Sequence, residues 1–231
     1  MNIYSYSLKM KTPIIGTYRM RDPVTVLSAA LRLGYRHIDT AELYRNETSV
    51  KEVLDREKIP GVEVTTKVWK YSKESVRRRC DIFERIDYLL LHRPTETYLE
   101  DYENLTRQIS DEELPIRKCG VSNFDSSKLD KLLEANLEVS VNQIELHPWN
   151  PQHETLEFCR QHKIPVTAHT VMGIRENLTP QQLINWAQQF SVPIIGTSNL
   201  SHLEENYRYL LNPKPVSIKP MMRHVLYPRM S

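Results

Sequence analysis

Short apolar segments rich in β-branched residues alternate along the chain with longer segments of helical character. Several of the short segments, such as Tyr88–Leu91 and Val192–Ile195, are almost unbroken apolar runs, a pattern typical of strands buried on both faces of a parallel sheet. The pattern predicts eight strands, at Pro13–Thr17, His37–Thr40, Glu63–Val68, Ile86–His92, Arg117–Ser122, Ser140–Glu145, Pro165–Thr170 and Pro193–Thr197.

The segments between these strands have the length and the end signals of helices. The first begins with Asp22 and Pro23, a pair that favours a helix N-terminus, and is followed by Gly34, a residue that favours a helix C-terminus. Ser126 and Thr179 are candidate N-caps. The predicted helices are Asp22–Leu33, Ser49–Arg56, Ser72–Arg85, Leu99–Ile109, Ser126–Glu134, Gln152–His162, Pro180–Gln189 and Ser201–Leu210.

Strict alternation of strands and helices predicts an α/β fold, a closed (β/α)8 TIM barrel, with an open doubly wound sheet as the alternative. No repeat, low-complexity stretch or linker divides the chain, so we expect residues 1–231 to form one domain. Chemistry in such barrels lies at the carboxyl ends of the strands. The polar residues near those ends are Asp39, Lys67, His92, Ser122, Asn123, Gln143, Glu145, His169 and Thr197.

Composition places the chain among ordinary globular proteins, with 40% hydrophobic and 26% charged residues. A formal net charge of +2 gives no reason to expect a nucleic acid or a membrane as partner. Cys80, Cys119 and Cys159 are widely spaced and odd in number, which favours a reducing compartment over a disulfide framework. We also find no signal peptide and no apolar run near the roughly 20 residues of a membrane span, so a cytoplasmic location is expected.

Five stretches are similar, in order, to motifs of the aldo-keto reductase family, and Gly16–Tyr18 resembles the end of the family's first strand. The longest, Gly34–Glu47, reads GYRHIDTAELYRNE. The others are Thr65–Trp69 (TTKVW), Asp87–Pro94 (DYLLLHRP), Gly120–Phe124 (GVSNF) and Val141–Pro148 (VNQIELHP).

The resemblance implies a carbonyl reductase whose four catalytic positions are Asp39, Tyr44, Lys67 and His92. Tyr44 would donate a proton to the carbonyl oxygen. We expect Lys67 to lower the pKa of this phenol from its usual value of about 10, and Asp39 to hold Lys67 in place and charged. His92, taken as neutral, would orient the carbonyl or pass a proton.

The resemblance also implies NADPH or NADH as cofactor, bound without the GxGxxG motif of Rossmann domains, which the chain lacks. Ser122, Asn123 and Gln143 match the family's contacts to the nicotinamide carboxamide. His169 replaces the Tyr that stacks on the nicotinamide, in the run HTVMG. The remaining positions expected to bind the cofactor are Thr17, Asp39, Met172, Thr197, Glu205 and Asn206.

The chain departs from the family where the cofactor's 2′-phosphate binds. Gly196 and His202 stand where the family has a Lys and an Arg. Losing two cations that face a dianion predicts a weak preference for NADP(H), or a shift toward NAD(H). No metal site is expected.

The substrate wall is predicted to consist of Tyr18, Trp69 and Arg93, where Arg93 replaces a Trp of the family. A cation at this place could favour an acidic or phosphorylated carbonyl substrate, or it could point to solvent. Few residues separate His169 from Pro193, and the tail after Asn212 is short, so we expect an open pocket and a monomer or weak oligomer. The alternatives are a cofactor-binding protein without catalysis, or an aldolase or isomerase that forms a Schiff base on Lys67.

Overall fold

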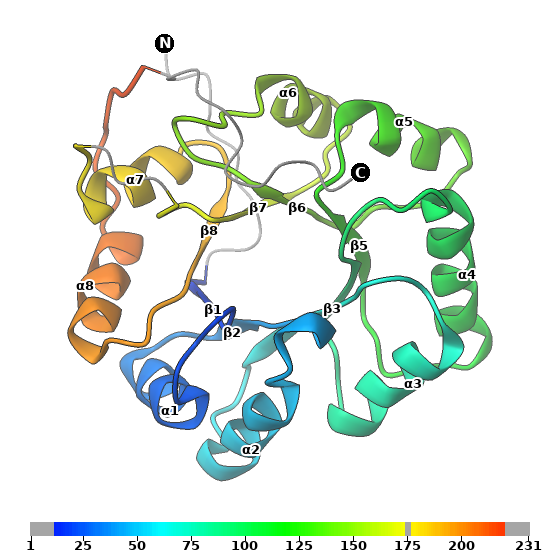
Figure 1. Cartoon of the computed structure of the whole chain (residues 1–231), viewed down its shortest axis with the longest axis horizontal. Coiled ribbons are helices and arrows are strands. Elements are labelled where there is room, and N and C mark those ends of the chain that lie inside the picture. Colours follow the sequence, from blue (N-terminus) through cyan, green and yellow to red (C-terminus); the bar gives the residue numbers. More distant parts are fainter. Residues whose placement is uncertain (1–11, 174–176, 220–231) are drawn as a thin grey trace.

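The computed structural model describes residues 12–173 and 177–219, in which the strands close into a parallel barrel (Figure 1). The strands follow one another around the barrel in chain order, and β8 pairs with β1. This closure confirms the (β/α)8 barrel and excludes the open doubly wound sheet, whose edge strands would remain unpaired. The strands are β1 (Ile14–Gly16), β2 (His37–Asp39), β3 (Glu63–Val68), β4 (Tyr88–Leu91), β5 (Cys119–Ser122), β6 (Asn142–Glu145), β7 (Val166–His169) and β8 (Val192–Ile195).

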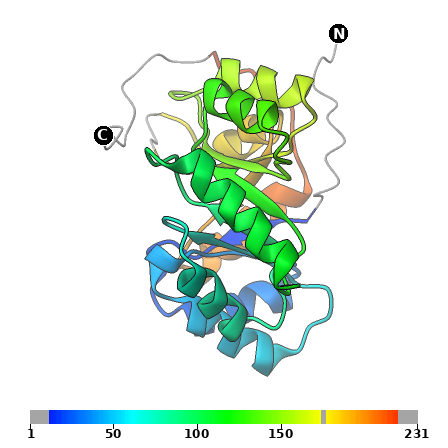
Figure 2. The same ribbon diagram turned by 90° about the vertical axis from the view of Figure 1, so that its right-hand side faces the viewer.

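Helices form an outer layer around the strands, as the side view in Figure 2 also shows. A short 3-10 helix, η1 (Glu42–Tyr44), follows β2 and has no counterpart in the sequence prediction. The α-helices are α1 (Pro23–Leu33), α2 (Glu47–Glu57), α3 (Lys73–Ile82), α4 (Tyr98–Asp111), α5 (Ser126–Glu134), α6 (His153–Gln161), α7 (Pro180–Ala187) and α8 (Leu200–Leu211).

The helix ends carry most of the expected caps. The side chain of Asp22 accepts a hydrogen bond from the backbone N–H of Thr25, and Gly34 ends α1 with a φ of 123°. Thr179 forms a capping box at the start of α7. The Ser126 cap is wrong by one residue: Asp125 caps α5, because its carboxylate accepts from the backbone N–H of Lys128.

Regular strand pairing is shorter than the apolar pattern predicted. Thr17, Thr40, His92 and Thr197 lie beyond the last paired residue of their strands. Ile86 precedes β4 and makes an isolated bridge with Ile116. The backbone N–H groups of Thr17, Thr40 and His92 still donate to the neighbouring strand, so at these ends the predicted strands exceed the regular ones by a single residue.

Most buried apolar side chains pack between strands and helices, while Tyr88, Leu90 and Val141 form a separate cluster within the barrel. Closer to the carboxyl ends of the strands the interior becomes polar. Asp39 and Gln143 border a small cavity there. In the described part of the chain, no helix has the length and apolarity needed to cross a membrane.

Candidate active site

A buried ion pair joins the carboxyl ends of β2 and β3. The ammonium of Lys67 donates to the Asp39 carboxylate over 2.7 Å and to the backbone oxygen of Thr40 over 2.8 Å. The side chain of Lys67 is 0% exposed and that of Asp39 is 4% exposed. The second carboxylate oxygen of Asp39 accepts from the Gln143 amide across the barrel over 2.7 Å. Both charged groups therefore have the partners that burial requires.

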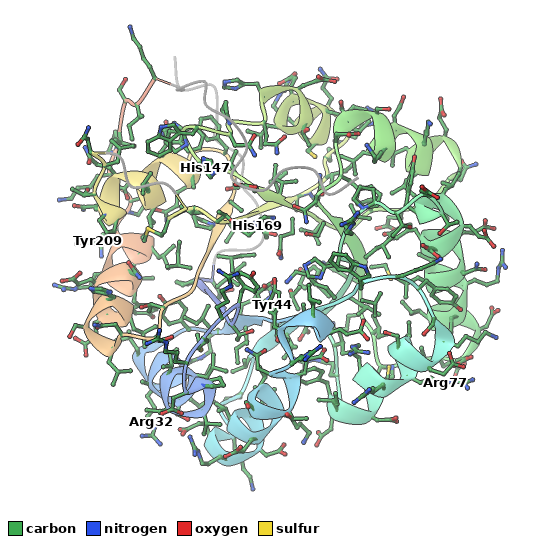
Figure 3. The ribbon with its side chains drawn as sticks, viewed as in Figure 1. Arg32, Tyr44, Arg77, His147, His169 and Tyr209 are labelled. Carbon is green, nitrogen blue, oxygen red and sulfur yellow. The ribbon has the colours of Figure 1, made fainter. Side chains whose placement is uncertain are left out.

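Tyr44 ends η1 and brings its phenol to this ion pair. Lys67 Nζ lies 3.4 Å from the phenolic oxygen and 5.0 Å from the ring centroid. The Tyr44 ring meets His92 edge-on at 5.8 Å and Tyr18 at 5.0 Å. Figure 3 shows Tyr44 and His169 directed toward the centre of the barrel.

Burial and charged neighbours have opposite effects on the pKa of Lys67. Burial lowers the pKa of Lys67, but the charge and hydrogen bonds of Asp39 and Tyr44 outweigh it, so the pKa lies above its ordinary value. The ammonium thus stays charged, which argues against Schiff-base chemistry, since that requires a free amine.

For Tyr44 the expected net lowering of the pKa is wrong. Burial raises the pKa of the phenol, and this outweighs the lowering by Lys67. The phenol is therefore in its protonated, donor form at neutral pH.

His92 and His169 are both neutral. Burial, reinforced by the positive charge of Lys67, lowers the pKa of each imidazole to about 3. Within the described residues, the buried Nδ1 of His92 has no hydrogen-bond partner. This unpartnered nitrogen belongs to a ring that touches Tyr44 and Trp69, and so borders the phenol.

The residues matched to nicotinamide binding lie together on the ends of β5, β6 and β7. The amide of Asn123 donates to the His92 carbonyl oxygen and to Ser122 Oγ, over 3.0 and 3.1 Å. Its oxygen lies 2.8 Å from Nε2 of His169. This bond and the 2.8 Å contact between His169 Nδ1 and Thr170 Oγ1 fix the plane of the imidazole. Gln143 holds Asp39, as described above.

At β8 the structure gives a physical reason for one departure from the family. Strands β1 and β8 approach so closely that a Cβ at Gly196 would lie 2.7 Å from the Gly16 carbonyl oxygen. A lysine is therefore sterically disfavoured at Gly196. His202 is exposed on α8, and Thr197 Oγ1 accepts from the backbone N–H of Asn199 over 3.1 Å.

The other residues expected to bind the cofactor are placed as follows. Thr17 is fully buried, and its hydroxyl donates to the Asp39 backbone oxygen and to Asn46. These two hydrogen bonds link the Thr17 side chain to the end of β2 and to the residue before α2. Asn206 is buried on α8, whereas Glu205 and Met172 are half-buried.

Aromatic side chains border the phenol on its open side. Tyr18 and Trp69 are 48% and 39% exposed, which makes them available to a ligand. The Arg93 guanidinium lies 4.8 Å from the centroid of the Trp69 ring, so it is stacked on this wall. Leu43, 51% exposed beside Tyr44, was not predicted from the sequence.

Sequence reasoning also missed the residues that hold the Tyr44 segment. Asn46 accepts from Thr17 and Thr40 at 3.2 and 2.9 Å. Glu42 and Glu47 contact Arg79 of α3. Glu47 is the last residue of the Gly34–Glu47 motif, and its place in that motif was the signal in the sequence that could have identified it. Arg79 belongs to an arginine run that looks like an exposed helix face.

This donor set fits a nicotinamide. Its carboxamide both donates and accepts hydrogen bonds. Ser122, Asn123 and Gln143 carry hydroxyl and amide groups of both kinds, which in this structure bond to neighbouring protein groups and would exchange some of those bonds for the carboxamide. His169 supplies a flat, neutral ring next to them. The unpartnered His92 nitrogen adds a polar atom suited to a ligand oxygen or hydroxyl.

Comparisons with known proteins agree with this geometry. The model of the family described as "Aldo/keto reductase family" matches residues 9–182. The 9,11-endoperoxide prostaglandin H2 reductase of Trypanosoma cruzi is 32% identical, over 87% of this chain and 82% of that protein. Methylglyoxal reductase DkgB of Escherichia coli O157:H7 is 30% identical, over 84% of this chain and 85% of that protein. The crystal structure of an aldo/keto reductase from Brucella melitensis superposes with a TM-score of 0.76 at 25% identity, covering 85% of this chain and 87% of that one.

The neutral histidines predict how stability depends on pH. His92 and His169 have folded pKa values of about 3, against about 6.5 for histidine in an unfolded chain. Between these values the unfolded chain binds more protons than the folded protein, so the free energy of unfolding falls as the pH drops below about 6.5. Each histidine contributes up to about 1.4 kcal/mol per pH unit to this fall.

Urea unfolding at pH 7.5 and 5.5 checks this. The doubly substituted variant His92→Gln/His169→Gln should lose less stability between the two pH values than the unsubstituted protein. His153→Gln, at an exposed position of α6, serves as the control. An equal loss in the double variant and the unsubstituted protein would show that the two imidazoles are charged in the folded state.

Proposed function

This chain belongs to the aldo/keto reductase family and is an NAD(P)H-dependent oxidoreductase, and we propose that it reduces the carbonyl group of aldehydes, ketones or sugars with Tyr44 as the proton donor. The observation that carries this proposal is the chain of contacts from Asp39 through Lys67 to Tyr44, with His92 at the edge of the phenol. These groups lie at the carboxyl ends of adjacent strands, where barrel enzymes place their chemistry.

Reduction adds a hydride to the carbonyl carbon and a proton to its oxygen. The bound nicotinamide cofactor supplies the hydride. Tyr44, protonated at neutral pH, gives its proton to the oxygen as negative charge develops there. The phenolate that remains is stabilised by the Lys67 ammonium 3.4 Å away, which Asp39 keeps charged.

The other residues of the rim orient the two reactants. Ser122, Asn123 and Gln143 would hold the nicotinamide carboxamide, and His169 would stack on its ring. His92 is neutral and would donate to or accept from the substrate oxygen without adding a second positive charge beside Lys67.

The open side of the site bears on substrate class. Tyr18 and Trp69 offer aromatic surface, while Arg93 adds a cation on the Trp69 face. One relative is named a methylglyoxal reductase, which suggests small aldehydes as substrates to try first. We propose that Arg93 extends the range to aldehydes that carry a carboxylate or a phosphate.

Replacing the phenol tests the proton donor. Tyr44→Phe should lower kcat for aldehyde reduction by roughly 10²–10⁴-fold, because the ring stays and the donor is lost. The Kd for NAD(P)H, followed by quenching of tryptophan fluorescence, should change little.

A Tyr44→Phe variant that retains full kcat would exclude Tyr44 as the donor. Tight binding of NAD(P)H with no turnover of any carbonyl compound by the unsubstituted protein would contradict the reductase proposal itself and favour a non-catalytic role.

The residues that follow β8 lead to a prediction about which nucleotide binds more tightly. We expect NADH to bind more tightly than NADPH, because Gly196 and His202 offer no permanent cation to the 2′-phosphate. His202→Arg should strengthen NADPH binding by about tenfold, which corresponds to one charge-assisted hydrogen bond of roughly 1.5 kcal/mol, and leave NADH binding unchanged. Titrating each nucleotide into both proteins measures this.

Arg32 provides the control. This exposed arginine of α1 makes two bonds to Glu57, at 2.9 and 2.8 Å, at the outer edge of the molecule (Figure 3). Arg32→Ala should not alter the ratio of the two Kd values. Equal affinities, or a strong NADPH preference in the unsubstituted protein, would show that the shift toward NADH is wrong.

Arg93 predicts selectivity for anionic substrates. Arg93→Ala should lower kcat/KM for 4-carboxybenzaldehyde about fivefold more than for its uncharged methyl ester, since one ionic contact is worth about 1 kcal/mol near a protein surface. Arg93→Lys, which keeps the charge, should retain most of the difference. The idea fails if Arg93→Ala affects both aldehydes alike.

A further inference from the structure

A buried arginine lies between two carboxylates that flank Tyr44 in the chain. Arg79 of α3 is 3% exposed, and its Nη2 donates to Glu47 Oε2 over 3.0 Å. Its Nη1 lies 3.4 Å from Glu42 Oε1. Glu42 begins η1, which Tyr44 ends, and Glu47 is the first residue of α2. One guanidinium therefore contacts both ends of the short segment that carries the phenol.

The same two carboxylates also contact the strand that carries Lys67. Glu47 accepts from the hydroxyl of Thr66, the residue before Lys67. Glu42 accepts from the backbone N–H of Trp69 over 3.2 Å. The phenol-bearing segment and the ammonium-bearing strand are thus joined through a shared set of charged groups.

Arg79 is anchored within its own helix. Its Nη1 donates to the backbone oxygen of Ser75 over 2.7 Å and to Ser75 Oγ over 3.0 Å. Ser75 Oγ in turn donates to Glu42 at 3.2 Å. A buried guanidinium held by several directional bonds has one geometry, unlike a flexible surface cation.

We propose that Arg79 is a positioning residue for the reaction: it fixes η1 so that the Tyr44 hydroxyl stays within reach of Lys67. This proposal rests on the proposed function of Tyr44. Without the guanidinium, the buried carboxylate of Glu47 loses its cation, and the segment from Glu42 to Glu47 shifts to solvate it. Small displacements of a donor are costly in rate, since proton transfer requires hydrogen-bond geometry.

The proposal separates the catalytic step from cofactor binding. The residues matched to the nicotinamide lie on or next to the ends of β5, β6 and β7, and the hydrogen bonds described for them involve none of Arg79, Glu42 and Glu47. Loss of Arg79 should therefore lower kcat and leave the Kd for NAD(P)H nearly unchanged.

A double-mutant cycle between Arg79 and Tyr44 tests this. Arg79→Gln should lower kcat for aldehyde reduction by 10- to 100-fold in the unsubstituted protein. In the Tyr44→Phe background, it should change the residual kcat by less than about twofold, because there is no phenol left to position. Arg79→Lys, which can pair with one carboxylate, should recover part of the rate.

Arg77 is the matched control. It lies two residues away on α3, and its guanidinium makes two bonds to Glu112, at 3.0 and 2.9 Å, at the outer edge of the molecule (Figure 3). Arg77→Gln thus removes an exposed arginine–carboxylate pair from the same helix, far from Tyr44, and should leave kcat within about twofold.

Glu42→Gln covers the case in which Arg79→Gln fails to fold. Glu42 is 35% exposed, so its neutral variant should fold, and the same cycle with Tyr44→Phe applies.

Equal losses of kcat in both backgrounds, or a parallel weakening of NAD(P)H binding, would show that the network is merely structural and overturn the proposal. Full kcat in Arg79→Gln, with a large loss in Tyr44→Phe, would overturn the positioning role and leave the proposed function standing. Full kcat in Tyr44→Phe would overturn both.

Discussion

The buried ion pair between Asp39 and Lys67 is the interaction on which the site depends. Two charges taken out of water are stable only when nearly every remaining hydrogen-bonding position is filled. The structure meets this demand with the Gln143 amide on Asp39 and with the Thr40 carbonyl oxygen and the Tyr44 hydroxyl on Lys67. The closed barrel supplies these groups because it brings the carboxyl ends of β2, β3 and β6 to one rim. The phenol proposed as the proton donor is thus also one of the contacts that stabilise the buried charge.

The charge of Lys67 also determines the state of its neighbours. It adds to burial in lowering the pKa of His92 and His169, so both imidazoles stay neutral beside it. It opposes, without overcoming, the burial that raises the pKa of Tyr44. A protonated phenol, a charged amine and neutral imidazoles result from one low-dielectric environment, in which each group takes the protonation state that its partners allow.

The barrel and the polar residues at its strand ends could be predicted from the sequence. The contacts that hold those residues in place could not. The alternation of short β-branched segments with helical ones located every strand. The signal was strongest where the strand is an apolar run, as in β4 and β8, and weaker in β2 (HID) and β6 (NQIE). Asp39, Lys67 and His92 lie at or near strand ends, where barrels place their chemistry. The direction of the Tyr44 pKa was missed, since burial of a loop residue depends on neighbours distant in sequence. Arg79 was missed for a related reason: a run of arginines on a helix looks solvent-exposed until the partner carboxylates are brought to it.

The residues proposed for proton donation and those proposed for cofactor choice lie on different strands of the barrel. The groups around the phenol come from β2, η1, β3 and β4, with α3 behind them, whereas the nicotinamide-matched residues come from β5 to β7 and the 2′-phosphate segment follows β8. The Gln143 to Asp39 bond joins the two regions across the barrel. Under the proposed function, a change at His202, which is exposed on α8, is expected to alter which nucleotide binds without disturbing the charges around Tyr44. In this chain the close approach of β1 and β8 disfavours a lysine at Gly196 on steric grounds, so the proposed cofactor preference would follow from how the barrel closes as well as from which charges line the site.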